Sequence, residues 1–567
     1  MRKLPWTFFT LILASVLLLA LVSCGEVCQH RDADDDARCD KCGEAFTDGE
    51  DITPTTYTVS VDDSLAGAGT AIGCGTYNSG EAIVLSAEAN LGYTFLGWYS
   101  ADSLVCEDEE YSLIIDKNLE ARFGIAPEMQ GFSFSSNADG FVITELADKT
   151  ISKLELPEYV TSIADDVLKD CEITEATVPV SVLSSLPRKI LKGTLTKVTI
   201  IGSGEIPLRA FYNYDKLADV TIGDGVTAIN KMAFYNCPSL TDLKMGNGVT
   251  LIGESAFDEC KKLERFNLSN SIETIGTRAF RNCELINSIV LPAGTTRVLT
   301  DAFSGCKIEE ATFPADLISS IPKTDLKKAI INGGKFIRDQ AFLRVTTLET
   351  VIIESGVKTI GKQAFWGCTS LTSIAIPDSV TAVNGNAFEG CTSLNAVHIT
   401  DIAAWCGIEF SRATDYGMSY ESSYYYSSNP LCYANNLYLN GELVTELVIP
   451  SGVSAIKPFA FEGCESITDV TIGNDVTIIY ELSFHLCTSL ERVTVKNGVE
   501  AIFVYVFRGC SSLESIVIPD SVALLGRAFA DCPNLTIYCE AQSKPDGWTS
   551  LWNDERPVVW GYTEEEN

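Results

Sequence analysis

Histidine, methionine and basic side chains are scarce in this sequence. Three histidines and five methionines are spread over 567 residues, and 41 Lys and Arg face 76 Asp and Glu, giving a formal charge of −35. This shortage of positive charge argues against sequence-independent binding to nucleic acid, which needs a basic surface. Three histidines provide few candidate side chains for general acid–base catalysis. No G-x-S-x-G, H-E-x-x-H or phosphate-binding glycine loop occurs. The sequence therefore favours a binding protein and not an enzyme.

Apolar runs long enough to span a bilayer are also missing beyond residue 22. The run from 11 to 22, preceded by two basic residues, is too short for a stable span and predicts an export signal over residues 1–23. Residues 21–24 read Leu-Val-Ser-Cys, which resembles the lipobox of bacterial lipoproteins. The resemblance implies that Cys24 carries lipid and anchors the exported chain at the bacterial cell envelope. An ordinary secretory signal with a chance cysteine is the alternative.

The segment next to this anchor, residues 24–50, groups side chains that bind metals. The spacing is C-x-H followed by C-x-x-C, and the residues are Cys28, His30, Cys39 and Cys42. Tetrahedral zinc prefers such ligands, and so short a segment has little core of its own. A structural zinc ion is therefore one hypothesis, and no other cofactor is required. A disulfide within the cluster, or a calcium loop on alternate aspartates, remains open.

Residues 51–125 predict a small β-rich domain. Short alternating stretches, such as 57–61, are separated by glycine-rich turns. The run GYTFLGWY at 92–99 and LEARF at 119–123 resemble the divergent internalin-type B-repeat of bacterial surface proteins. The resemblance implies a spacer or adhesion module, with Phe95 and Trp98 in the core. Cys74 and Cys106 fall in this domain and could pair.

The rest of the chain is governed by repetition. An Ala-Phe dipeptide or a close variant recurs every 23 residues within three blocks, except for a last interval of 22. The phenylalanines are Phe211, Phe234, Phe257, Phe280 and Phe303, then Phe342, Phe365 and Phe388, then Phe461, Phe484, Phe507 and Phe529. In most units a cysteine follows three residues later. One cysteine per unit at one position predicts a ladder of small buried thiols and not a disulfide framework.

One unit shows why the repeats must stack. Residues 371–377 alternate apolar and polar side chains and predict a strand ended by Pro377, which lacks the amide that a ladder needs. Residues 380–383 predict a second short strand, and Phe388 and Cys391 would share one side of a helical turn. A single unit cannot bury these side chains, so each repeat must pack on its neighbours.

This pattern resembles the BspA-like class of bacterial leucine-rich repeats over about two thirds of the chain. The predicted fold is a repeat solenoid, a β-rich leucine-rich-repeat array with two short strands and a helical turn per ~23-residue unit, preceded by a small all-β domain. We place a linker and the start of the solenoid at 126–150, and the array at 151–540. Residues 541–567, rich in aromatics, predict a C-terminal cap and tail that includes Trp552 and Trp560.

Two segments depart from the period. An irregular unit lies near 304–341, where one Ala-Phe turn is missing. An insertion near 401–445 contains a tyrosine cluster, which could be a contact site or could pack on the solenoid. The tyrosines are Tyr416, Tyr420, Tyr424, Tyr425 and Tyr426.

The outward positions of the first strands predict a continuous binding surface. They include Thr221, Lys244, Asn267, Val290, Ala375, His398, Thr471, Thr494 and Val517. We therefore predict a surface-anchored, adhesin-like scaffold that recognises extracellular or host-matrix proteins, with glycans as possible ligands. A carbohydrate-binding accessory protein, with Trp366, Trp405 and the tyrosines stacking on sugars, or a structural envelope protein is the alternative.

Overall fold

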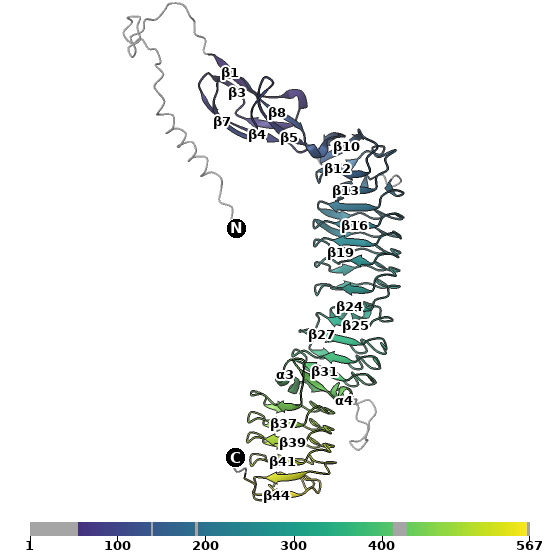
Figure 1. Cartoon of the computed structure of the whole chain (residues 1–567), viewed down its shortest axis with the longest axis vertical. Helices are drawn as coiled ribbons and strands as arrows, with labels where there is room; N and C mark the ends of the chain where they lie inside the picture. Colours follow the sequence, from purple (N-terminus) through teal and green to yellow (C-terminus); the bar gives the residue numbers. More distant parts are fainter. Residues whose placement is uncertain (1–54, 138–139, 187–190, 412–427, 564–567) are drawn as a thin grey trace, which may run out of the picture. The chain divides into compact units, whose positions relative to one another are not determined.

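The computed structural model describes residues 55–137, 140–186, 191–411 and 428–563. The chain divides between Ala126 and Pro127 into two compact units, which are described separately below (Figure 1). Within the described ranges, no helix combines the length and the apolar character needed to cross a bilayer.

The N-terminal unit is built from two β-sheets that enclose one core. A five-stranded sheet has the order β3-β1-β8-β5-β6, and a three-stranded sheet has the order β2-β4-β7. The strands are β1 (Thr56–Val61), β2 (Gly69–Ile72), β3 (Gly75–Asn78), β4 (Ala82–Ala89), β5 (Tyr93–Ser100), β6 (Ser103–Cys106), β7 (Glu110–Ile114) and β8 (Leu119–Ile125). Trp98 is fully buried and its indole donates to the Asp108 carbonyl at 3.1 Å, so its predicted core role is confirmed. Phe95 packs edge-on against it, with ring centroids 5.6 Å apart.

The pairing of Cys74 with Cys106 is absent from this unit, because both thiols are free. Cys74 directly precedes β3 and Cys106 ends β6, and these strands form the two opposite edges of the five-stranded sheet. Strands lie about 4.8 Å apart, which separates the two edges by roughly 19 Å. A disulfide needs Cα atoms within about 7 Å. The sheet order therefore forbids this bond.

The C-terminal unit is a solenoid in which most repeats contribute a first and a second strand (Figure 1). The unit opens with η4 (Pro127–Met129) and a sheet of β9 (Phe132–Asn137), β10 (Gly140–Leu146) and β12 (Val160–Ile163). The first strands then form parallel sheets of six, eight and six strands, in which β33 and β34 alone pair antiparallel. The second strands form parallel sheets of five, four and four strands.

The first strands are β11 (Lys153–Glu155), β13 (Glu175–Pro179), β14 (Lys197–Ile201), β16 (Asp219–Ile222), β18 (Asp242–Met245), β20 (Arg265–Phe266), β22 (Ser288–Val290), β24 (Glu310–Phe313), β25 (Lys328–Ile331), β27 (Thr350–Ile353), β29 (Ser373–Ala375), β31 (Ala396–Ile399), β33 (Leu437–Leu439), β34 (Glu442–Leu443), β35 (Glu446–Val448), β37 (Asp469–Ile472), β39 (Arg492–Val495), β41 (Ser515–Ile518), β43 (Thr536–Cys539) and β44 (Val558–Trp560). The second strands are β15 (Gly204–Ile206), β17 (Val226–Ile229), β19 (Leu251–Ile252), β21 (Thr274–Ile275), β23 (Arg297–Val298), β26 (Phe336–Ile337), β28 (Thr359–Ile360), β30 (Ala382–Val383), β32 (Glu409–Phe410), β36 (Ala455–Ile456), β38 (Ile478–Ile479), β40 (Ala501–Ile502) and β42 (Leu524–Leu525).

The Ala-Phe segment differs in detail from the predicted helical turn. It is a chain of tight turns in which two residues have left-handed backbone, for example Met232 (φ 56°) and Asn236 (φ 53°). The amide of Phe234 donates to the carbonyl of Ala256 in the next repeat at 2.8 Å, and the amides two residues to either side do the same. In a helix these amides would instead donate to carbonyls of the same segment. Here they form a third ladder that runs along the solenoid.

The core is a column of stacked phenylalanine rings. Consecutive Phe rings lie 5.0 to 5.8 Å apart and within 13° of parallel in each block. Each ring is buried, which confirms the predicted inward register.

The repeat cysteines form the predicted ladder of free, buried thiols. The Cys391 thiol donates to the Phe365 carbonyl at 3.2 Å, and eight other repeat cysteines make the same bond to the preceding repeat. Burial raises the pKa of Cys306 and of Cys391 to about 12, so these thiols stay protonated and unreactive at neutral pH.

Short helices replace regular repeat segments at three places. In the irregular unit, η6 (Ala315–Ser320) stands between β23 and β26, while the first-strand sheet continues through β24 and β25. The earlier helix η5 (Val180–Ser184) stands in the same way between β12 and β15. The insertion contributes α3 (Ile402–Cys406) and α4 (Leu431–Ala434).

The described ends of the insertion join the second block of repeats to the third. The Trp405 indole donates to the Ala460 carbonyl at 2.7 Å, and the Asn429 amide donates to the Phe459 carbonyl at 2.6 Å. Trp405 is 1% exposed, so it cannot stack on a sugar as one alternative required.

At the C-terminal end, three tryptophans cover the last repeat. The rings of Trp548, Trp552 and Trp560 lie 4.6 to 5.9 Å from one another. Trp548 and Trp552 are buried, and the Trp548 indole donates to the Val522 carbonyl at 2.9 Å. The cluster, which includes Trp560 of β44, covers the apolar end of the solenoid.

Candidate protein-binding face

The outward residues of the first strands form three aligned stretches along the solenoid, together called the outward row below. Side chains alternate across a strand, so most outward residues lie between two buried ones, as Thr221 lies between Val220 and Ile222. Strand register aligns the row in three stretches. They are Thr177, Thr199, Thr221 and Lys244; Val290, Thr312, Ile330, Ile352, Ala375, His398 and Tyr438; and Val448, Thr471, Thr494, Val517, Tyr538 and Val559.

Several apolar members of this row are open to solvent. Val290 is 61% exposed, Ile352 is 36% exposed and Val448 is 63% exposed. The fold does not require these side chains, because the same position is filled by threonine next to Val290 and Val448 and by alanine next to Ile352. The predicted outward register is confirmed, but the surface predicted to be continuous from Lys244 through Asn267 to Val290 is interrupted between β20 and β22.

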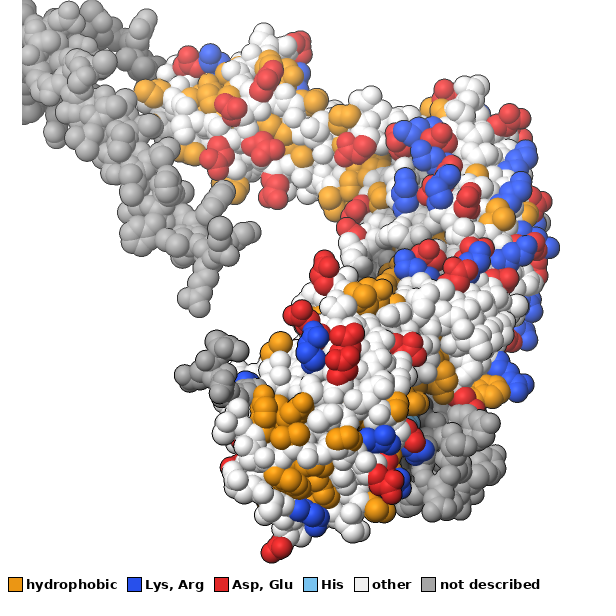
Figure 2. Space-filling model, turned by 60° about the horizontal axis from the view of Figure 1, so that its bottom comes forward, with side chains coloured by type: hydrophobic (Ala, Val, Ile, Leu, Met, Phe, Trp, Pro, Cys, Tyr) orange, Lys and Arg blue, Asp and Glu red, His pale blue; other side chains and the backbone are white. Residues whose placement is uncertain are grey.

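Ion pairs between neighbouring repeats run beside the outward row. Arg265 binds Asp242 at 3.0 Å, and Arg492 binds Asp469 at 2.6 Å. Lys328 and Glu310 lie 3.6 Å apart. Such exposed pairs contribute little stability, but they balance the local charge. On the visible side of the solenoid, Figure 2 shows acidic and basic side chains interleaved, without a broad area of one sign.

A hollow of about 710 Å³ opens where the outward row is interrupted. Strand β20 ends one sheet and β22 begins the next, while the second strands β21 and β23 stay paired in register. The solenoid therefore opens on the first-strand side only. Phe266 and Val290 line the hollow with polar residues from both edges. The Asn267 side chain accepts a hydrogen bond from the amide of Met245 at 3.3 Å and donates one to its carbonyl at 3.2 Å. These bonds satisfy backbone groups at the end of β18 that would otherwise face the hollow.

Sequence reasoning missed this hollow. The turn that follows β20, Ser269-Asn270-Ser271, gives no signal of it. Proline and serine fill the same two positions in Pro377-Asp378-Ser379 after β29, where the sheet continues to β31.

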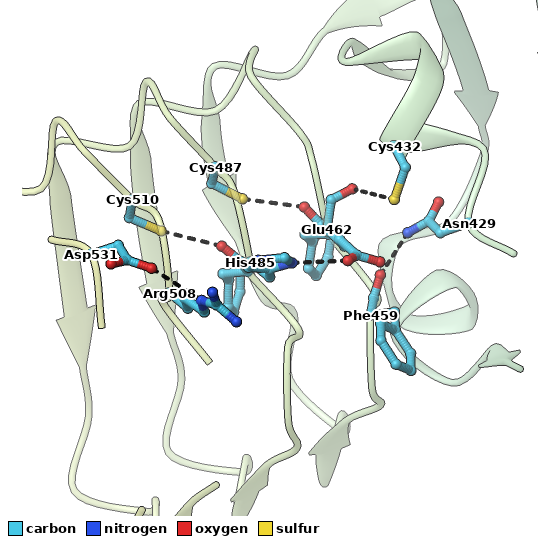
Figure 3. A network of polar contacts seen from close by, with 11 residues as sticks. Asn429, Cys432, Phe459, Glu462, His485, Cys487, Arg508, Cys510 and Asp531 are labelled. Carbon is cyan, nitrogen blue, oxygen red and sulfur yellow. Dashed lines mark hydrogen bonds and ion pairs between the residues drawn. The ribbon is translucent and has the colours of Figure 1, made fainter. Parts of the chain in front are cut away.

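Neither described histidine stands in a catalytic arrangement. His398 lies in the outward row and stacks on Tyr438, with ring centroids 4.9 Å apart. His485 is buried, and its Nδ1 lies 2.9 Å from Oε1 of Glu462 in the preceding repeat (Figure 3). Asp258 and Arg281 make an equivalent pair in the first block at 3.0 Å. Among the described residues, no group of three or more potential ligands is placed to hold a metal ion.

The other predicted site residues lie outside the described residues. They are the lipidation residue Cys24, the ligand cluster Cys28, His30, Cys39 and Cys42, and the tyrosines Tyr416, Tyr420, Tyr424, Tyr425 and Tyr426.

Family models agree with this geometry. The BspA type leucine rich repeat region matches residues 145–201, 204–330, 320–406 and 434–542, more than half of the chain. The chain belongs to the BspA-type leucine-rich-repeat family. Residues 57–126 match the divergent InlB B-repeat domain. Both resemblances drawn from the sequence are therefore confirmed.

Solved structures similar to this BspA-type protein include bacterial leucine-rich-repeat proteins. A leucine rich cell surface protein from Faecalibacterium prausnitzii is 24% identical, over 65% of this chain and 93% of that one, with a TM-score of 0.29. A leucine-rich repeat protein from Bacteroides ovatus is 23% identical, over 76% and 97%, with a TM-score of 0.25. TM-scores this low add no argument to the family match. No curated protein matches the chain significantly.

A BspA-type solenoid is a scaffold on which binding surfaces can be built. Leucine-rich-repeat arrays present long surfaces whose residues vary while the core repeats. The outward row has this character, because its side chains change from repeat to repeat over a constant column of phenylalanines.

Proposed function

We propose that this protein is an adhesin-like scaffold at the bacterial surface that binds extracellular or host-matrix proteins through the outward row. The observation that carries the proposal is the exposure of Val290, Ile352 and Val448 on a face that folding leaves free. Exposed apolar side chains within a polar, charge-balanced surface are typical of protein contacts. The hollow beside Val290 offers a place for a protruding side chain of the partner.

The test is a pull-down with the full chain against matrix proteins and mucins, read by mass spectrometry. The variant Val290→Glu/Ile352→Glu/Val448→Glu places charge on the outward row. The control Phe336→Glu makes the same change at a 54% exposed residue of the second strands. We expect proteins captured by the wild type and the control to be lost from the triple variant. A protein partner that the triple variant retains would contradict the assigned face, and capture of glycans alone would favour a carbohydrate-binding role.

Export and lipidation at Cys24 form part of the proposal and rest on the N-terminal sequence. Metabolic labelling with a palmitate analogue should mark the wild type and not Cys24→Ala. Labelling of both chains would show that Cys24 is not the anchor.

A structural zinc ion held by Cys28, His30, Cys39 and Cys42 is a separate proposal that rests on their spacing. The full chain, purified under reducing conditions, should carry one zinc ion that Cys39→Ser/Cys42→Ser lacks. Equal metal content in both would remove the proposal.

The tyrosines of the insertion, including Tyr424, Tyr425 and Tyr426, are proposed as a further contact site on the ground of their density. Replacing these three by alanine should weaken capture of a partner, or of a glycan, without changing the thermal melt. Unchanged capture would remove the tyrosines from the contact site.

A further inference from the structure

The second-strand side of the solenoid carries an exposed apolar patch in the third block of repeats. It lies at the corner where the second strand leads into the Ala-Phe turn. The corner patch consists of Lys457, Tyr480, Phe503, Val504 and Leu524. Phe503, Val504 and Leu524 are 40%, 42% and 56% exposed.

The patch is rigid because its side chains stack from repeat to repeat. Lys457, Tyr480 and Phe503 each follow directly after a second strand in three successive repeats. The Tyr480 and Phe503 rings lie 5.4 Å apart and 16° from parallel, and the Lys457 ammonium lies 5.7 Å from the Tyr480 ring centre. Gly526 occupies the same position in the next repeat, so no side chain from that position covers the outer face of Phe503.

Other repeats show that the fold does not require these apolar side chains. The same second strand and Ala-Phe turn occur there with small or polar residues at the two positions of Phe503 and Val504. Five such repeats have Asn230-Lys231, Gly253-Glu254, Gly276-Thr277, Gly361-Lys362 and Asn384-Gly385 at these positions. Exposed apolar groups that serve no purpose in the fold mark interaction sites.

We propose that the corner patch binds an extended protein segment that presents a large apolar side chain and a carboxylate about three residues apart. The apolar side chain packs on Phe503 beside Leu524, and the carboxylate pairs with Lys457. The Lys457 ammonium lies 5.7 Å from the Tyr480 ring centre, which lies 5.4 Å from the Phe503 ring centre. The two ends are therefore at most roughly 11 Å apart, a distance that about three extended residues span.

Charge complementarity supports the acidic end of this segment. Among the described residues, Lys457 forms no ion pair and lies only over the Tyr480 ring. The nearby arginines are already engaged, because Arg508 binds Asp531 at 3.1 Å and Arg527 binds Asp554 at 2.7 Å (Figure 3 shows the first pair). Lys457 is therefore the cation of this corner that is available to a partner.

The same arrangement disfavours a sugar as the ligand. A sugar needs hydrogen-bonding groups around the stacking ring, and Phe503 is flanked by Val504 and Leu524. The corner patch lies on the second strands, so this inference is independent of the outward row. Either one can fail while the other stands.

The experiment pans phage-displayed random peptides on the full chain and measures the affinity of selected synthetic peptides by fluorescence anisotropy. One variant, Phe503→Gly/Val504→Lys, copies the residues that Gly361 and Lys362 supply in another repeat. A second, Lys457→Glu, reverses the charge. The control, Leu251→Thr, alters a 36% exposed leucine at the position in β19 that Leu524 has in β42.

We expect selected peptides to share an acidic residue about three positions from a large apolar one. Their affinity should fall about tenfold or more in both patch variants and stay within about twofold in the control. Thermal melts verify that each variant is folded. Failure to select such peptides, or peptides that bind the wild type and both patch variants equally, would overturn the proposal. Selective binding of glycans at Phe503 would overturn the choice of partner.

Discussion

The thiol ladder gives the solenoid a specific sensitivity to alkaline pH. Cys391 is 1% exposed and donates to the Phe365 carbonyl at 3.2 Å, and burial raises its pKa from 9.0 to about 12. The folded state therefore keeps a proton that the unfolded state loses above pH 9. Stability from this thiol is complete below pH 9 and falls as the pH rises from 9 towards 12, by about 1.4 kcal/mol per pH unit.

The substitution Cys391→Ser isolates this effect. Serine keeps a hydroxyl near the Phe365 carbonyl but does not titrate in this range. At about pH 8 we expect the variant to be less stable by roughly 1 to 3 kcal/mol, because a more polar group is buried in a weaker geometry. Between about pH 8 and 10.5 the wild type alone loses about 2 kcal/mol through this thiol. The penalty of the substitution should therefore shrink by that amount or change sign.

The assay is urea unfolding under reducing conditions, followed by tryptophan fluorescence, to which Trp366 and Trp405 on either side of Cys391 in the sequence contribute. Other titrations cancel, because they are common to both chains. The control Leu394→Ala removes a non-titrating side chain that is 3% exposed in the same repeat, so its penalty should be independent of pH. A Cys391→Ser penalty that is equally constant up to about pH 10.5 would refute the raised pKa and the buried, protonated ladder.

Three further outcomes follow from the packing. Phe388→Ala should lower the free energy of unfolding of its block by about 3 to 5 kcal/mol in urea, because it empties one place in the ring column, while Phe336→Ala at a 54% exposed position should cost far less; equal effects would contradict the inward register. Brief alkylation of the native chain followed by mass spectrometry should modify Cys74, Cys106 and Cys432 among the described thiols and reach the ladder only in urea; rapid labelling of Cys260 would show that the ladder is open. Arg281→Met leaves the 1% exposed Asp258 unpaired and should lower stability by about 3 kcal/mol or more, whereas Asp258→Asn/Arg281→Met should recover part of it; no recovery in thermal melts would mean that the pair is not coupled.

The repeat architecture could be predicted from the sequence because a solenoid makes its contacts at a fixed, short separation. The Phe column, the inward cysteines and the outward row all follow from side chains that recur every 23 residues. Each ring meets its own equivalent in the next repeat, as Phe365 meets Phe388. A period in the sequence therefore translates directly into a neighbour in space.

The Ala-Phe segment could not be predicted in the same detail. Its i, i+3 spacing of Phe and Cys is equally compatible with a helical turn, which was the expectation. The left-handed residues, such as Met232 and Asn236, become favourable only because they direct amides to carbonyls of the next repeat. These hydrogen bonds form only between stacked repeats, so an isolated repeat would not favour the left-handed backbone.

The sequence by itself determined the family, the repeat, the buried ring column and the side of each strand that faces solvent. Only the tertiary structure decided where the array departs from uniformity. The hollow between β20 and β22, the bond from Trp405 to Ala460 across 55 residues, and the corner patch around Phe503 belong to this second class. The physical reason is that periodic contacts are encoded in every repeat, whereas a gap, a long-range bond or an uncovered ring depends on what neighbouring chain segments leave open.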